Sequence, residues 1–278
     1  MKKLIALAVA AASMPAMAAV SVSGSYNVEY VDDSSTKEVQ SYDVDVAVSA
    51  SAEMDNGMTI SASLEADDTD DDGSVTISGA FGSIAMGDVA GALDAVDGEA
   101  IGTARDAQSA GAGTDASVTY TLPTFVEGLT VKASMNAEDG GNGVENDDAS
   151  SVAASYSMSG VKFHLGTESR DAADVTGYGI SYSAAGFTVG YGYSEVDADA
   201  ANADVETSAL AAGYTVGNLT LAVNTKEVEN EAGATTADVT SMSVAYSMGG
   251  GVTAYASTTE DDETANSETT RFGIKFAF

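Results

Sequence analysis

The chain has 278 residues, and its 43 acidic residues against 10 lysines and arginines give a formal net charge of −33 at pH 7. This excess of negative charge repels nucleic acid and attracts cations, so we expect no nucleic-acid partner. Because the chain has no cysteine and one histidine, it lacks the material for a disulfide framework, a cysteine nucleophile or a typical zinc site.

The first residues have the three parts of a secretory signal peptide. Two lysines precede an apolar run over 4–12, which is followed by the helix breaker Pro15 and by the small-residue pattern AMA ending at Ala18. The apolar run is too short to span about 30 Å of hydrocarbon. We therefore predict a signal peptide over 1–18 and an exported mature chain over 19–278.

From residue 20 onward, apolar and polar side chains alternate with a period of two, which places them on opposite faces of β-strands. The predicted strands cover 20–31, 39–53, 58–66, 74–79, 83–88, 115–122, 128–138, 150–158, 161–168, 176–184, 187–196, 206–215, 218–227, 238–247, 251–259 and 267–278. These are sixteen strands, and an even number returns both ends of the mature chain to one side, as in single-chain outer-membrane barrels. The modest strand lengths also allow fourteen strands.

The connections between these strands alternate strictly between short and long. Acidic residues gather in the long connections, such as 67–73 and 260–266, whereas most short turns carry none. The first short connection contains Asn56-Gly57, a hairpin signal whose central residues must accept positive φ. The separation of long acidic connections from short, nearly neutral turns predicts an up-and-down barrel. Such a barrel has both termini at the short-turn end, one anionic rim and one nearly neutral rim.

The last predicted strand indicates which face meets lipid. Phe272, Ile274 and Phe276 form one row, and the basic residues Arg271 and Lys275 lie on the other. A charge on the lipid face at the bilayer midplane costs about 2–4 kcal/mol, so the basic row must face a wet lumen. The same parity gives the predicted inward-facing basic residues as Lys132, Lys162, Lys226, Arg271 and Lys275.

The connection over 89–114 is by far the longest and differs in kind from the others. Its carboxylates are dispersed among Ala, Gly, Leu, Val and Ile, so it has apolar residues that can pack against another surface. Loops that only face water do not need such residues.

The remaining motifs give little evidence of a metal site or a catalytic site. The run 68–73 matches the start of a calcium-binding loop, but Gly79 stands at the twelfth position, where an EF-hand needs a bidentate Glu. We expect no cofactor, and we leave open loose binding of a divalent cation such as calcium, which could bridge the acidic loops to lipopolysaccharide. His164 has no catalytic partner inferable from spacing, which argues against an enzyme.

An antiparallel sandwich would show the same alternation along its strands. A secreted acidic β-sandwich or adhesin that binds calcium or a surface polymer is therefore the alternative. Such a protein has no reason to separate short neutral turns from long acidic loops so completely. We favour an all-β fold, a transmembrane antiparallel up-and-down barrel of sixteen strands.

The sequence resembles a known family, the general bacterial porins, and most closely the alphaproteobacterial sixteen-stranded type. The resemblance rests on the stretch GSVTISGAFGSIAMGDVAGALDAVDGEA over 73–100, on the signal peptide, and on RFGIKFAF over 271–278 with its terminal aromatic. It implies that the long loop after the fifth strand folds into the lumen and narrows it, with loop acids facing basic wall residues. It also implies that Phe278 addresses the barrel assembly machinery.

Carried onto this chain, the resemblance implies a constriction loop over 89–114 that packs against the inner wall through residues such as Val89, Leu93, Val96 and Ile101. The acidic side would comprise Asp88, Asp94, Asp97, Glu99 and Asp106. The family's arginine cluster is not visible, because the basic residues are scattered over several strands. The prediction is a homotrimeric outer-membrane channel that passes small hydrophilic solutes and prefers cations.

Overall fold

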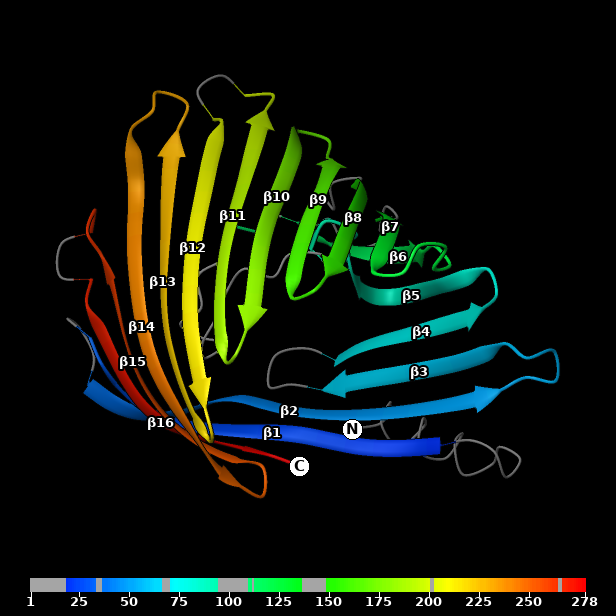
Figure 1. Cartoon of the computed structure of the whole chain (residues 1–278), viewed down its shortest axis with the longest axis horizontal. Helices are drawn as coiled ribbons and strands as arrows, with labels where there is room; N and C mark the ends of the chain where they lie inside the picture. The colour runs from blue at the N-terminus through cyan, green and yellow to red at the C-terminus, as the bar shows by residue number, and fades with distance from the viewer. Residues whose placement is uncertain are drawn as a thin grey trace.

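Sixteen antiparallel strands form one closed barrel (Figure 1). The computed structural model describes residues 19–33, 37–66, 71–94, 110–111, 113–136, 149–200, 203–264 and 267–278. Each strand pairs with its neighbours in the sequence, and the last strand pairs with the first. Within these described ranges, no helix is long and apolar enough to cross a membrane.

The observed strands agree with the sixteen predicted ones and exclude the fourteen-strand alternative. They are β1 (Ala19–Asp32), β2 (Lys37–Glu53), β3 (Thr59–Ala66), β4 (Asp71–Gly79), β5 (Gly82–Ala90), β6 (Asp115–Thr121), β7 (Leu129–Met135), β8 (Ser150–Met158), β9 (Val161–Ser169), β10 (Ala173–Ala184), β11 (Phe187–Ala198), β12 (Val205–Val216), β13 (Leu219–Asn230), β14 (Thr235–Gly249), β15 (Val252–Asp261) and β16 (Thr269–Ala277). Both ends of the barrel sequence lie at the short-turn end, as predicted.

The two faces of the barrel have opposite character. On β16, the predicted lipid-facing residues Phe272 and Ile274 are 56% and 54% exposed. The inner face is polar instead, and Asn224 and Ser241 are buried there in the wall. An apolar outside around a polar inside is the arrangement of a barrel that stands in lipid and encloses water.

Aromatic side chains collect on the outer face of several strands. Phe187 stacks on Tyr214 across β11 and β12, with ring centroids 4.2 Å apart. Tyr178 and Tyr193 form a tilted ring pair across β10 and β11, with ring centroids 5.1 Å apart. These contacts lie on the lipid-facing rows of their strands, where amphipathic rings suit the membrane interface.

Two of the short turns place a non-glycine residue in the left-handed region. The turn at Ala185-Gly186 has φ values of 49° and 84°, and Ser159-Gly160 has 50° and 85°. Positive φ at both central residues is the type I′ geometry, whose twist matches the flanking strands. The expectation of positive φ at both Asn56 and Gly57 is wrong, because only Gly57 has it. There the Asn56 carboxamide accepts a hydrogen bond from the Met58 N–H instead, within a longer turn.

The C-terminal residue continues the pairing that closes the barrel. The Phe278 N–H donates to the Gly24 carbonyl at 3.0 Å, and the Gly24 N–H donates back to Phe278 at 3.1 Å. The ring of Phe278 lies over Gly24, where a Cβ would come within 2.7 Å of it. Glycine at position 24 therefore makes the space that the terminal aromatic ring occupies.

The strained turn at Ala185 gives a first prediction. A non-glycine residue in the left-handed region costs about 1 kcal/mol, and asparagine tolerates that region best. The variant Ala185→Asn should raise the free energy of unfolding by about 0.5–1 kcal/mol. Urea titration of the barrel in lipid vesicles, followed by circular dichroism, measures this.

The matched control is Ala184→Asn, one residue earlier at the last position of β10, where φ is not positive and asparagine relieves no strain. That variant should not be stabilised. Equal stability of the two variants would contradict the assignment of the turn strain to Ala185.

Candidate functional site

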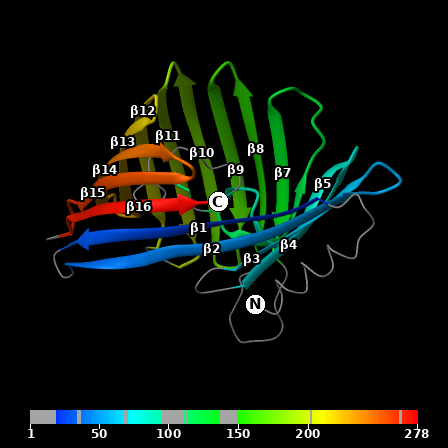
Figure 2. The same ribbon diagram turned by 90° about the horizontal axis from the view of Figure 1, so that it is seen from below.

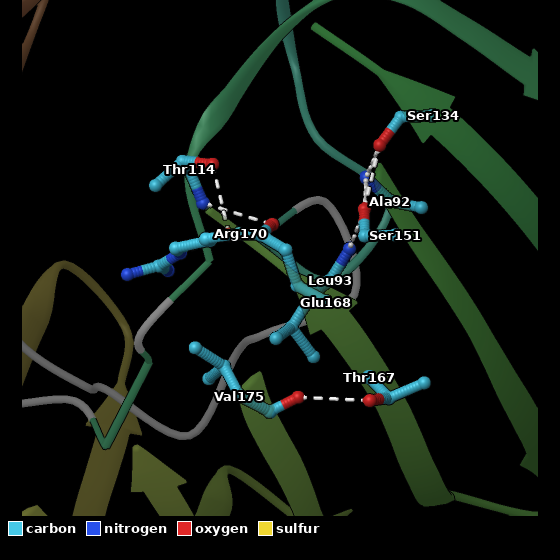
Figure 3. A network of polar contacts seen from close by, with 9 residues as sticks. All are labelled: Ala92, Leu93, Thr114, Ser134, Ser151, Thr167, Glu168, Arg170 and Val175. Carbon is cyan, nitrogen blue, oxygen red and sulfur yellow. Dashed lines mark hydrogen bonds and ion pairs between the residues drawn. The ribbon is translucent and has the colours of Figure 1, made fainter. Parts of the chain in front are cut away.

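The connection between β5 and β6 is attached to the inner wall of the barrel at both of its described ends (Figure 3). At the first end, the Ala92 N–H donates to the hydroxyl oxygens of Ser134 and Ser151, at 2.8 and 2.9 Å. The two serines face each other on β7 and β8, with their oxygens 2.6 Å apart. The chain therefore turns inward immediately after β5.

Leu93 anchors the same end by packing. Its side chain is buried, and its Cδ1 atom lies against Gly166 on β9 and Gly177 on β10. A Cβ on Gly166 would stand 2.9 Å from that atom, which is too close for an ordinary contact. Glycines on the inner wall therefore form a shallow seat for Leu93, as expected for an apolar residue that packs the loop to the wall.

Val89 behaves differently from the expectation. It pairs with Ala116 in the β5–β6 ladder, which also shows that β5 continues to Ala90 before the connection begins. The register of this ladder shifts between Met86 and Val89, next to Gly87 with a φ of 112°. The connection between the strands is thus 91–114, and Val96 and Ile101 lie outside the described residues.

The second end of the connection is held by a buried carboxylate. Glu168 on β9 accepts hydrogen bonds from the Thr114 hydroxyl at 2.9 Å and from the Thr114 N–H at 3.3 Å. Arg170 donates to the same carboxylate through Nε at 2.6 Å. The Gly91 N–H donates to the Thr114 carbonyl, so the two ends also hold each other.

Sequence reasoning did not identify Glu168 and Arg170 as residues of this site. The alternation of Lys162, His164 and Gly166 on β9 does place Glu168 on the inward row. Parity could therefore have found the direction of its side chain. That Thr114, 54 residues earlier, is its partner depends on how the barrel is folded.

The predicted acidic residues are only partly within the described structure. Asp88 is exposed on β5, beside the register shift, and Asp94 is exposed at the end of the anchored turn. Asp97, Glu99 and Asp106 lie outside the described residues. The structure therefore locates one acidic residue, Asp94, directly beside the wall anchor.

The predicted basic residues divide among three regions of the wall. Lys132 on β7 interacts electrostatically with Asp94 and with Lys162 on β9, so these three charges gather near the anchored turn. Lys226 on β13 instead interacts with Asp261 at the end of β15. The five residues do not form one basic cluster.

The other two basic residues lie across the barrel. Arg271 and Lys275 are on β16, which is eight strands from β8 in either direction around the ring. The Arg271 Nε is 3.8 Å from an oxygen of Glu29 on β1, so its charge has a close counter-charge.

His164 is a buried residue of the inner wall whose ring lies over Gly179. In the part of the chain that the structure describes, no three His, Asp or Glu side chains are grouped so that they could hold a metal ion. The chemistry of the site is therefore that of a charged, hydrogen-bonded wall.

A closed sixteen-strand barrel with an apolar outside, a polar inside and a connection attached to its inner wall defines a transmembrane barrel of the pore-forming class. A model of the Gram-negative porin family matches residues 5–266, and the chain belongs to this family. Its members are channel proteins of the outer membrane and not enzymes, and the outer membrane is the location of this chain.

Relatives and solved structures agree with this assignment. A porin of Rhodobacter capsulatus is 32% identical over 174 residues, which cover 60% of this chain and 54% of that protein, so the match spans about half of the relative. A solved porin structure has a TM-score of 0.79 at 21% identity, covering 94% of this chain and all of that one. OmpT of Vibrio cholerae, in its trimer form, has a TM-score of 0.71 at 15% identity with the same coverage.

The Glu168 anchor gives a second prediction. In Glu168→Ala, the Thr114 N–H loses its acceptor, and hydrogen bonds to charged groups contribute about 1.5–3 kcal/mol. Hydrogen–deuterium exchange of the segment 113–115 should therefore become roughly tenfold faster or more. Mass spectrometry of the folded protein in detergent measures it.

Glu195→Ala is the matched control, because Glu195 is an exposed carboxylate on the outer face of β11. Its exchange at 113–115 should equal that of the unmodified protein. An unchanged rate in Glu168→Ala would mean that Glu168 does not hold this end of the connection.

Proposed function

We propose that this protein is a passive diffusion channel for small hydrophilic solutes and ions. The observation that carries the proposal is the closed ring of sixteen strands with a polar inner face, since barrels of this size enclose an aqueous channel. Transport through such a pore is selection by size and charge. It needs no covalent step and no cofactor.

The connection after β5 is the proposed constriction. Its described ends are fixed to the inner wall of β7 to β10, which supports a course inside the lumen. The proposed acidic side comprises Asp88, Asp94, Asp97, Glu99 and Asp106. The proposed basic side comprises Lys132, Lys162, Lys226, Arg271 and Lys275.

Cation preference follows from the charge balance. The chain carries far more carboxylates than basic groups. Where basic groups occur on the described inner wall, acidic groups accompany several of them, as in the Arg170–Glu168 and Arg271–Glu29 pairs. A pore lined by a net negative field concentrates cations and repels anions.

The proposed assembly is a homotrimer in outer-membrane lipid and lipopolysaccharide. Vibrio cholerae OmpT, which has the same fold, is described in a trimer form. The terminal Phe278, exposed on the outer face at the end of the β1–β16 pair, is the proposed signal for the barrel assembly machinery. An acidic adhesin is less consistent with the apolar outer face of this barrel.

Planar-bilayer recording tests the channel and its selectivity together. In a KCl gradient, the reversal potential should have the sign of a cation-preferring pore. The preference should weaken as the salt concentration rises, because screening shortens the range of the wall charges. Absence of channels would contradict the proposed function, and an anion-selective potential would contradict the cation preference alone.

Asp94 offers a local test of the constriction. Asp94→Asn removes a carboxylate whose charge acts on Lys132, so the wall there becomes more positive. The permeability ratio of K⁺ to Cl⁻ should fall about twofold, the effect of one charge acting on a nearby ion through water. The same bilayer recording measures the ratio.

Asp174→Asn is the control for this variant. It removes the same charge from the outer face of β10, where no permeating ion passes. If both variants shift the ratio equally, Asp94 has no special place in the ion path.

A further inference from the structure

A buried polar cluster crosses the seam where the barrel closes. It consists of Asn27 and Glu29 on β1, Tyr255 on β15 and Arg271 on β16, and is called the seam cluster below. Figure 2 shows β16 lying between β15 and β1, so the cluster joins three successive strands of the closed ring. Asn27 and Glu29 are each 1% exposed and Tyr255 is 8% exposed.

A glycine allows the seam cluster to form. Gly273 on β16 stands directly between Tyr255 and Glu29 in the register. A Cβ at Gly273 would collide with the tyrosine ring, so the absence of a side chain lets the ring lie across β16. The Tyr255 hydroxyl thereby reaches β1, where it donates to Glu29 Oε2 at 2.8 Å and accepts from Asn27 Nδ2 at 3.0 Å.

The second oxygen of Glu29 faces Arg271. The Arg271 Nε is 3.8 Å from Glu29 Oε1, and the side chains are 15% and 0% exposed. Burying a carboxylate is costly unless it is both hydrogen-bonded and paired with an opposite charge. The seam cluster supplies both conditions, through the tyrosine hydroxyl at one oxygen and the guanidinium at the other.

This geometry has a consequence for ions in the lumen. A single positive charge on the wall attracts anions over several ångströms. A positive charge with a fixed negative charge beside it acts as a short dipole, and the two Coulomb contributions largely cancel at the distance of a passing ion. Arg271 therefore attracts anions in the lumen only weakly as long as the negative charge of Glu29 lies beside it.

We infer that Glu29 is a specificity-determining positioning residue, which fixes the Arg271 guanidinium to the seam wall and cancels its charge toward the lumen. The inference rests on the proposed channel function. Glu29 does not itself meet the permeating ion. It sets the ion preference by deciding whether Arg271 presents a net positive charge.

The direct test is Glu29→Gln, which keeps an oxygen to accept from Tyr255 and removes the negative charge. The K⁺ to Cl⁻ permeability ratio should fall about twofold, because Arg271 then acts as one added positive charge. The double variant Glu29→Gln/Arg271→Met removes both charges and should return the ratio to that of the unmodified protein. Reversal potentials in a KCl gradient give both values.

Glu195→Gln is the matched control. It makes the same change at an exposed carboxylate on the outer face of β11, away from the seam cluster, so it should leave the permeability ratio unchanged. If channels form and Glu29→Gln leaves the ratio unchanged, or the double variant does not restore it, the inference is wrong while the channel function stands. Failure of the unmodified protein to form channels would contradict the proposed function instead.

A measurement on the unmodified protein keeps the inference testable if Glu29→Gln does not fold. An arginine-specific dicarbonyl reagent should modify Arg271 roughly tenfold more slowly, or slower still, in the folded barrel than in the urea-unfolded chain, because the reaction requires exposing a guanidinium that is buried beside Glu29. Peptide mass spectrometry resolves the site. Equal rates in the two states would overturn the assignment.

Discussion

The closing of the backbone ladder between β1 and β16 is the constraint on which the rest of the structure depends. Hydrocarbon offers no partners to backbone N–H and C=O groups, so a sheet can cross a membrane only when it has no open edge. Here eight residue pairs, from Ser25 with Ala277 to Asp32 with Thr270, complete the ring. Glycines at 24 and 273 leave room for Phe278 outside and Tyr255 inside. Both faces of the seam are thus packed as well as hydrogen-bonded.

The inner wall both anchors the long connection and lines the proposed ion path. Serine hydroxyls and glycine surfaces on β7 to β10 receive one end of the long connection, and Glu168 receives the other. Charged residues of the wall are used in the same way. Arg170 and Arg271 each lie against a buried carboxylate, so they contribute to structure before they contribute to the field in the lumen. In the proposed channel, the excess of acids over bases therefore sets the ion preference.

Most of the barrel could be predicted because its signals are local. Period-two alternation gives a strand wherever it persists, and the last strand shows its lipid face in Phe272 and Ile274 alone. The local pattern did not predict the geometry of one turn or the position of one register shift. Asn56 uses its carboxamide to build a longer turn, and a bulge beside Gly87 shifts the register after Met86. Neither outcome follows from alternation.

By itself, the sequence determined where the alternating strands lie, the face that each presents to lipid, the end at which both termini lie and the apolar content that sets the connection after β5 apart from the others. These properties depend on neighbours along the chain, because side-chain direction in a strand repeats every two residues. Only the tertiary structure decided that Thr114 meets Glu168 and that Tyr255 reaches Glu29 across Gly273. Those contacts depend on register between strands far apart in sequence, which is fixed when the ring closes.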